Sequence, residues 1–315
     1  MRAMQNSHLI TRRAALSILP AALAVSQPSS RSILLGGPIF LKAEDPRELA
    51  REHRRLGYSA AYCPESKATD TDRVKAIQES FAAENVVIAE VGAWRNILDP
   101  NPAKRSSNLS FVKERLALAE AVGARCCVDI AGSFNPTVWF GPNPKNLSAE
   151  FFDATVENCR HIIDEIKPKR TQFTIEMMPW AVPDSPESYL KLIRAVDRKA
   201  FAVHLDVCNI INSPARFYHN GQVISECFRL LGPHIASCHA KDLRWEIELN
   251  VHFVEVQPGL GEIDYRAYLT ELAKLPHKPP LMLEHLKKAE EYQAAKEYIW
   301  KVGKELNVNF GPTAV

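Results

Sequence analysis

The sequence predicts an α/β protein built as a single-domain (β/α)8 TIM barrel. From residue 33 onward, short apolar runs alternate with longer amphipathic stretches. This alternation is typical of parallel βαβ units, and eight such strands are enough to close a barrel. The alternative is an open doubly wound sheet, which usually has a glycine-rich turn after its first strand. No G-x-G-x-x-G motif occurs in the chain, so the barrel is favoured.

Eight segments have the length and composition of buried strands. They cover residues 33–40, 58–63, 86–91, 126–130, 171–177, 201–206, 234–239 and 280–284. The amphipathic stretches predict helices at 46–56, 71–84, about 106–122, 147–166, 185–196, 221–231 and 289–306. Ser148 has the position of a helix cap. The segment between 239 and 280 is predicted to be a long loop, in which Gly259 and Gly261 allow a tight turn held against the strand ends.

Composition narrows the function classes. Of the 315 residues, 46% are hydrophobic and 24% are charged, as in an average soluble globular protein. The net charge is only +2, and no lysine and arginine stripe occurs, so no nucleic-acid partner is expected. Beyond the N-terminus no apolar run reaches about 18 residues, so stable membrane insertion is not expected either. The seven cysteines include no C-x-x-C pair and predict no disulfide framework.

Residues 1–32 are predicted to be a twin-arginine export signal followed by a disordered arm. Arg12 and Arg13 precede a short apolar stretch, and Ala22-Leu23-Ala24 offers small residues for cleavage. We therefore expect a periplasmic protein that begins near Val25, with a barrel domain over residues 33–310. The alternative is a cytoplasmic protein with a disordered basic arm.

Metal-ligand residue types recur at the ends of the last four predicted strands. These strands end in Glu176, Asp206, His239 and Glu284, at gaps of 30, 33 and 45 residues. The carboxyl ends of all strands meet at one face of a barrel, so we expect the four side chains to converge. Three converging carboxylates repel one another unless a cation lies between them. Oxygen ligands with one imidazole suit Mn²⁺, Mg²⁺ or Co²⁺, and Zn²⁺ as a further alternative.

At these positions the chain resembles the sugar phosphate isomerase/epimerase superfamily, the xylose isomerase-like TIM barrels. The resemblance covers roughly residues 33–306. Its motifs are Thr174-Ile175-Glu176, Leu205-Asp206-Val207-Cys208-Asn209, His239-Ala240-Lys241-Asp242, Pro258-Gly259-Leu260-Gly261, Ile263-Asp264-Tyr265 and Leu283-Glu284. It implies that Glu176, Asp206, His239 and Glu284 bind one divalent metal ion, with Mn²⁺ first. It also implies that Glu176 and Glu284 are the catalytic acid and base.

The reaction that the resemblance implies is isomerisation or epimerisation of a small carbohydrate, a sugar or keto-sugar. A metal ion bound to a carbonyl oxygen stabilises the enediolate that forms when a neighbouring carbon loses a proton. One carboxylate takes that proton and a second acid returns it. The alternative is a lyase or dehydratase, in which the same enolisation expels an oxygen from a keto-sugar, an inosose or a keto-glycoside.

Three positions depart from the family pattern for free ketohexoses. Family epimerases have His, Glu and Arg where this chain has Asn209, Val182 and Trp245. These departures count against simple ketohexose 3-epimerase activity and favour another substrate. An apurinic endonuclease would need further histidine ligands, which Tyr62 and Asn209 replace. A non-catalytic sugar-binding protein on the same barrel stays open as another function. Assembly into a homo-oligomer also stays open.

Four residues are candidate substrate contacts: Glu90, Trp180, Asn209 and Lys241. Glu90 ends the third predicted strand and either contacts substrate or pairs with Arg95. Lys241 lies two residues after His239, where it either binds a substrate oxyanion or leaving group or pairs with Asp242. Trp180 lies on a loop at the same end of the barrel, as do Trp139 and Phe140. Aromatic rings there either stack on a sugar or pack the loops.

Overall fold

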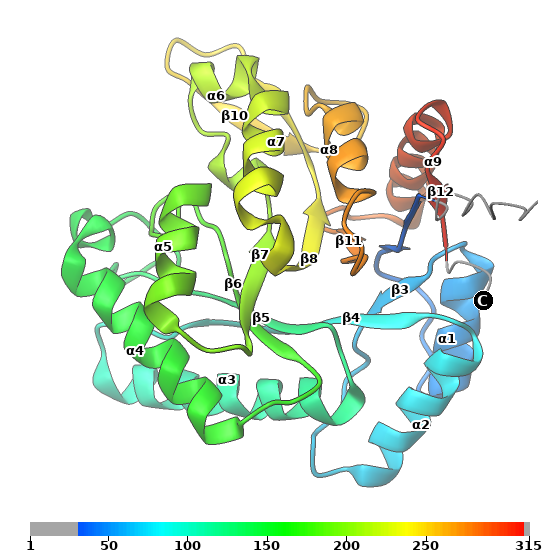
Figure 1. The fold of residues 1–315 in the computed structure, drawn as a ribbon, viewed down its shortest axis with the longest axis horizontal. Helices are drawn as coiled ribbons and strands as arrows, with labels where there is room; N and C mark the ends of the chain where they lie inside the picture. Colours follow the sequence, from blue (N-terminus) through cyan, green and yellow to red (C-terminus); the bar gives the residue numbers. More distant parts are fainter. Residues whose placement is uncertain (1–30, 312–315) are drawn as a thin grey trace, which may run out of the picture. The chain divides into compact units, whose positions relative to one another are not determined.

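Eight parallel strands close into a barrel in the computed structural model, which describes residues 31–311 (Figure 1). The barrel strands are β2 (Leu35–Gly36), β3 (Ala60–Tyr62), β4 (Val87–Asn96), β5 (Cys126–Ile130), β6 (Gln172–Glu176), β7 (Phe201–Leu205), β8 (Ile235–Ala240) and β11 (Leu281–Leu283). Strands β2 to β8 follow one another in sequence order around the barrel, and β11 pairs with both β8 and β2. The predicted (β/α)8 barrel is therefore confirmed.

Helices surround this barrel. They are α1 (Pro46–Arg55), α2 (Thr71–Ala83), α3 (Pro102–Val122), α4 (Ala149–Ile166), α5 (Pro186–Val196), α6 (Pro214–Tyr218), α7 (Asn220–Leu231), α8 (Tyr265–Leu272) and α9 (Ala289–Glu305). Because helices cover the outer face and side chains fill the inside, the strands are buried on both faces. All five residues of β5, for example, are buried.

Local sequence explains where several helices begin. Asp45 and Asn101 each accept hydrogen bonds from backbone N–H groups in the first turn, and proline follows directly as the first residue of α1 and α3. Ser148 caps α4 by accepting from Phe151 N at 3.2 Å, as the sequence predicts. Helix α3 begins four residues before its predicted start because Asn101 and Pro102 together form a helix-start signal.

Two strands differ most in length from the predicted ranges. The first was expected over 33–40, but only Leu35–Gly36 joins the barrel. Gly36 lies so close to β3 that a Cβ there would overlap with the carbonyl oxygen of Ala60. Strand β4 continues five residues past the predicted end at 91, and this extension includes Trp94 in a left-handed conformation (φ 40°). The extension brings Trp94 toward the barrel opening.

The segment between 239 and 280 is not the plain loop that the sequence predicts. It contains an antiparallel hairpin of β9 (Asp242–Trp245) and β10 (Phe253–Val256), followed by α8. Helix α8 has only eight residues and includes two tyrosines, which have modest helix propensity. Its buried residues Tyr265, Tyr268, Leu269 and Leu272 show that packing on the barrel stabilises it.

The two ends of the described part lie together. Strand β1 (Ser32–Ile33) pairs in parallel with β12 (Asn309–Phe310). Within the described residues, no helix has the length and apolar character needed to cross a membrane. All seven cysteines are free thiols. The predicted export signal and arm, residues 1–32, lie outside the described residues except for Arg31 and Ser32.

Candidate metal centre

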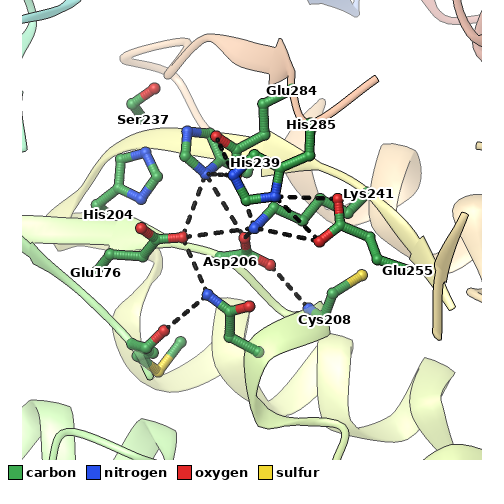
Figure 2. Close-up of polar contacts among 12 residues, drawn as sticks. Glu176, His204, Asp206, Cys208, Ser237, His239, Lys241, Glu255, Glu284 and His285 are labelled. Carbon is green, nitrogen blue, oxygen red and sulfur yellow. Dashed lines mark hydrogen bonds and ion pairs between the residues drawn. The ribbon is translucent and has the colours of Figure 1, made fainter. Parts of the chain in front are cut away.

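Four side chains meet at the carboxyl end of the barrel (Figure 2). They are Glu176 at the end of β6, Asp206 directly after β7, His239 in β8 and Glu284 directly after β11. One potential ligand atom from each lies within 4.8 Å of those of the others. His239 Nδ1 lies 2.8 Å from Glu284 Oε1, 3.3 Å from Glu176 Oε1 and 3.5 Å from Asp206 Oδ2. The structure thus brings together the four residues that the sequence predicts as metal ligands.

Neighbouring groups fix the direction of two of these carboxylates. Asp206 Oδ1 accepts a hydrogen bond from Cys208 N at 3.0 Å. Asn209 donates through Nδ2 to Glu176 Oε1 at 3.0 Å and to Met177 O at 3.1 Å. Asn209, predicted as a substrate contact, therefore holds Glu176 in place in this structure.

Lys241 places its ammonium group among the carboxylates. Its Nζ lies 2.7 Å from Glu284 Oε1 and 2.8 Å from Asp206 Oδ2, and 4.0 Å from Glu176 Oε1. Only 2% of the Lys241 side chain is exposed. The alternative partner Asp242 is not used, because its carboxylate accepts four backbone N–H groups instead.

These charges shift the pKa values in opposite directions. Burial opposes ionisation of Asp206, but Lys241 and His239 outweigh it and hold the pKa of Asp206 well below its usual range. Burial is likewise outweighed at Glu284, where His239 and Lys241 lower the pKa to about 2. At Glu176 burial dominates and raises the pKa. The two glutamates therefore differ in proton affinity in this structure.

The residues present fit a divalent cation. Asp206 Oδ2 is buried and lies 2.8 Å from Lys241 Nζ and 3.5 Å from His239 Nδ1. A buried carboxylate is costly without a compensating positive charge, which the ammonium supplies here and which a bound cation would also supply. Three carboxylates and one imidazole form the mixed oxygen and nitrogen set that Mn²⁺, Mg²⁺, Co²⁺ or Zn²⁺ accepts. Glu176, Asp206, His239 and Glu284 would hold such an ion.

Glu90 was one of the predicted substrate contacts, but it does not lie at the opening of the barrel. It is 1% exposed and lies beneath His239, with Oε2 3.3 Å from His239 Nε2. The alternative partner also fails, because Arg95 instead stacks on the ring of Phe111, 4.2 Å from its centroid. Sequence spacing places Glu90 at a strand end but does not show which residue lies opposite it across the barrel.

Two rim residues had no predicted role at the site. Glu255 on β10 and His285 after β11 contact each other, with His285 Nδ1 3.1 Å from both Glu255 oxygens. Glu255 Oε2 also lies 3.8 Å from Lys241 Nζ. Side-chain exposure rises from 2% at Lys241 to 33% at Glu255 and 57% at His285, so this pair lies on the solvent side of Lys241. The available sequence signal for β10 was the apolar–polar alternation Val254-Glu255-Val256.

Aromatic residues lie at the same end of the barrel, but in different places. Trp180 is 55% exposed on the loop after β6, and Trp139 and Phe140 contact each other edge to face at 5.2 Å. Trp94, which the sequence analysis did not select, has its ring centroid 6.1 Å from that of His239. Trp245 instead lines a groove of about 620 Å³ outside the hairpin, with Phe217 and Phe253.

Comparisons with known proteins identify the family to which this fold belongs. A family model described as xylose isomerase-like TIM barrel matches residues 50–301. The chain belongs to the xylose isomerase-like TIM barrel family. No curated protein matches the sequence.

Solved structures of this family share the fold at low identity. A xylose isomerase-like TIM barrel protein from Mycobacterium smegmatis, in complex with magnesium, is 18% identical, with a TM-score of 0.61 over 88% of this chain and 98% of that one. The 3-keto-D-glucoside 4-epimerase of E. coli is 12% identical, with a TM-score of 0.62 over 87% and 100%. A probable 3-DHS dehydratase from Bacillus anthracis is 13% identical, with a TM-score of 0.62 over 85% and 97%. At these identities the likeness shows the fold alone.

Proposed function

We propose that the protein is a divalent-metal-dependent isomerase or epimerase that acts on a sugar or keto-sugar. The observation that carries the proposal is the convergence of Glu176, Asp206, His239 and Glu284, with ligand atoms within 4.8 Å of one another. An ion held by these residues would act as a Lewis acid that stabilises negative charge on the substrate oxygens. Mn²⁺ is our first choice of ion.

The chain's own residues move the proton. Glu176 and Glu284 approach the centre from β6 and β11, which are not neighbours in the barrel, and we place the substrate between the two carboxylates. One takes the proton from the carbon next to the carbonyl, and the other returns a proton to the opposite face or to the neighbouring carbon. Lys241 stabilises oxyanion charge, because its ammonium lies 2.7 Å from Glu284 Oε1 and points into the same centre.

Solvent-deuterium exchange tests this function. The metal-loaded full chain is incubated in D2O with free ketoses and with 3-keto-glycosides, and deuterium on the carbon next to the carbonyl is followed by NMR. We expect exchange with the native protein, and its loss by at least about 100-fold in Glu176→Gln and in Glu284→Gln, because general acid–base groups contribute that much. Chelation of the metal should also abolish it.

Glu65→Gln is the matched control, because Glu65 follows β3 at the same end of the barrel and its side chain is 92% exposed. This variant should exchange at the native rate. Retained exchange in both Glu176→Gln and Glu284→Gln would refute the assigned roles, and elemental analysis that finds no divalent ion would refute the metal site.

A lyase or dehydratase is the second candidate, and the position of Lys241 favours it. An ammonium group beside the acid–base carboxylate can stabilise the negative charge that develops on a departing hydroxyl or glycosidic oxygen. The departures at Val182 and Trp245 also leave the usual ketohexose contacts missing. Elimination from keto-glycosides, assayed beside epimerisation of free ketoses, separates the two reactions.

We also propose that the protein is exported to the periplasm by its twin-arginine signal. The support is the Arg12-Arg13 pair ahead of the apolar stretch 14–25. N-terminal sequencing of the protein from the periplasmic fraction should find a start near Val25. A start at Met1 in the cytosolic fraction would refute export.

A further inference from the structure

A closed group of polar side chains lies beneath the metal centre, inside the barrel. It consists of Glu90, His204 and Ser237, and none of the three takes part in the proposed proton transfer. The side chains of Glu90 and His204 are fully buried, and Ser237 is 0% exposed. Buried charged groups are costly, so a carboxylate in this position needs several partners.

Glu90 uses both of its oxygens. Oε1 lies 3.0 Å from His204 Nε2 and also accepts the hydroxyl of Ser237. Oε2 lies 3.3 Å from His239 Nε2. His204, Ser237 and His239 therefore surround one carboxylate, which in its ionised form only accepts hydrogen bonds.

The free nitrogen of His204 shows where the protons lie. His204 Nδ1 is buried and has no hydrogen-bond partner. A proton on that atom would be an unsatisfied buried donor, which is costly, whereas a proton on Nε2 is satisfied by Glu90. With His204 and Ser237 both donating to Oε1, Oε2 is left for the Nε2 proton of His239.

Packing alone does not set the orientation of the His239 ring. The rings of His204 and Trp94 lie against it, with centroids 4.1 Å and 6.1 Å away, and limit its plane. A 180° rotation of the imidazole about its Cβ–Cγ bond leaves these ring contacts almost unchanged but exchanges nitrogen and carbon positions. The polar contacts distinguish the two orientations, and Glu90 provides the one at Nε2.

We propose that Glu90 is a positioning residue that keeps a proton on His239 Nε2, so that Nδ1 faces Glu176, Asp206 and Glu284 as the metal-binding atom. This inference rests on the proposed function, because it assigns the device that orients one of its metal ligands. Carboxylates behind metal-binding histidines act in this way in other proteins, and their loss weakens metal binding about 10- to 100-fold.

The experiment measures Mn²⁺ binding to the full chain by titration calorimetry. Glu90→Gln should raise the dissociation constant about 10- to 100-fold, because an amide N–H facing His239 favours the wrong tautomer. Asp129→Asn is the matched control: Asp129 is also a fully buried carboxylate on a barrel strand, but it contacts Arg95 N at 2.7 Å rather than the metal centre. This control should bind Mn²⁺ as the native protein does.

NMR of the imidazole nitrogens gives a readout that does not need the variant to fold. In the native protein, both metal-free and loaded with diamagnetic Mg²⁺, His239 Nε2 should carry a slowly exchanging proton. An unprotonated Nε2 in either form would overturn the inference, as would a Glu90→Gln protein that binds Mn²⁺ within twofold of the native value. If the native protein binds no Mn²⁺, the proposed function fails and the inference fails with it.

Discussion

At the scale of single residues, the rim of the barrel holds several buried charges because each has a counter-charge close by. Lys241 illustrates this: burial would lower its pKa, but Asp206, Glu176 and Glu284 raise it far above its usual value. Removing one partner of such a buried pair typically costs about 3–5 kcal/mol. The same ammonium both compensates the carboxylates and faces the substrate position of the proposed reaction.

Asp129 is a buried carboxylate whose pKa is raised more by burial than it is lowered by Arg95, and it makes stability depend on pH. Burial raises its pKa to about 7. Because the unfolded value is about 4, the folded state holds a proton that the unfolded state has lost between these pH values, and stability falls by about 1.4 kcal/mol per pH unit as pH rises through this window. Asp129→Asn removes this term, so the variant should gain stability relative to the native protein up to about pH 7 and then level off.

Urea unfolding of both proteins between pH 5 and pH 8 checks this prediction, with the difference in unfolding free energy as the readout. Parallel curves would show that Asp129 titrates normally.

At the scale of elements, Asp242 ties the β9–β10 hairpin and the following loop to the barrel. Its Oδ2 accepts from Gly259 N at 2.8 Å and Gly261 N at 3.1 Å, and its Oδ1 accepts from Leu243 N and Ile263 N, both at 2.9 Å. The turn that the sequence predicts at Gly259 and Gly261 is thus held by a carboxylate that starts the hairpin. Because Glu255 lies on β10 and its Oε2 is 3.8 Å from Lys241 Nζ, this clamp also holds a carboxylate beside the metal centre.

Asp242→Ala should therefore loosen the whole segment. We expect a loss of about 3 kcal/mol, since a hydrogen bond to a charged group contributes about 1.5–3 kcal/mol and the four are not additive. Hydrogen exchange of the four amides should become faster by the same free energy. Asp242→Asn keeps one accepting oxygen, so it should protect either the Gly259 and Gly261 amides or the Leu243 and Ile263 amides, but not both pairs. Unchanged hydrogen exchange of all four amides in Asp242→Ala would contradict the clamp.

At the scale of the whole molecule, the C-terminal part of the described chain pairs with its N-terminal part at two places. Strand β11 closes the barrel against β2, and β12 pairs with β1 outside it. Gly303 in α9 permits the pairing of β12 with β1, because a Cβ at this position would overlap with the ring of Phe310 on β12. In most exposed helix positions, replacing glycine by alanine stabilises by about 0.5–1 kcal/mol.

Gly303→Ala should have the opposite sign. Overpacking against Phe310 should destabilise the protein by about 1–3 kcal/mol in urea unfolding. In the background of Phe310→Ala, the same substitution should be neutral or stabilising, which gives a double-mutant cycle. Equal effects in both backgrounds would show that β12 does not pack on Gly303.

The sequence by itself determined the barrel and the position of its four metal-ligand candidates. Glu176, Asp206, His239 and Glu284 each follow an apolar run, and this local pattern fixes which side of a strand and which end of the barrel they occupy. The start of α4 at Ser148 was predictable for the same reason, because the capping signal lies in neighbouring residues. Helix α8 and the hairpin were missed because their stability comes from packing on the barrel rather than from propensity.

The tertiary structure alone decided which other polar groups meet around these four residues. Glu90 and His239 are 149 residues apart, and Glu255 and His285 are 30 apart on different elements. Such contacts depend on how strands face one another across the barrel and on how a hairpin folds back over its opening, and neither is encoded in the spacing of one segment. The charges around Lys241 belong to the same class, because its four carboxylate neighbours come from three strand ends and from the hairpin strand β10.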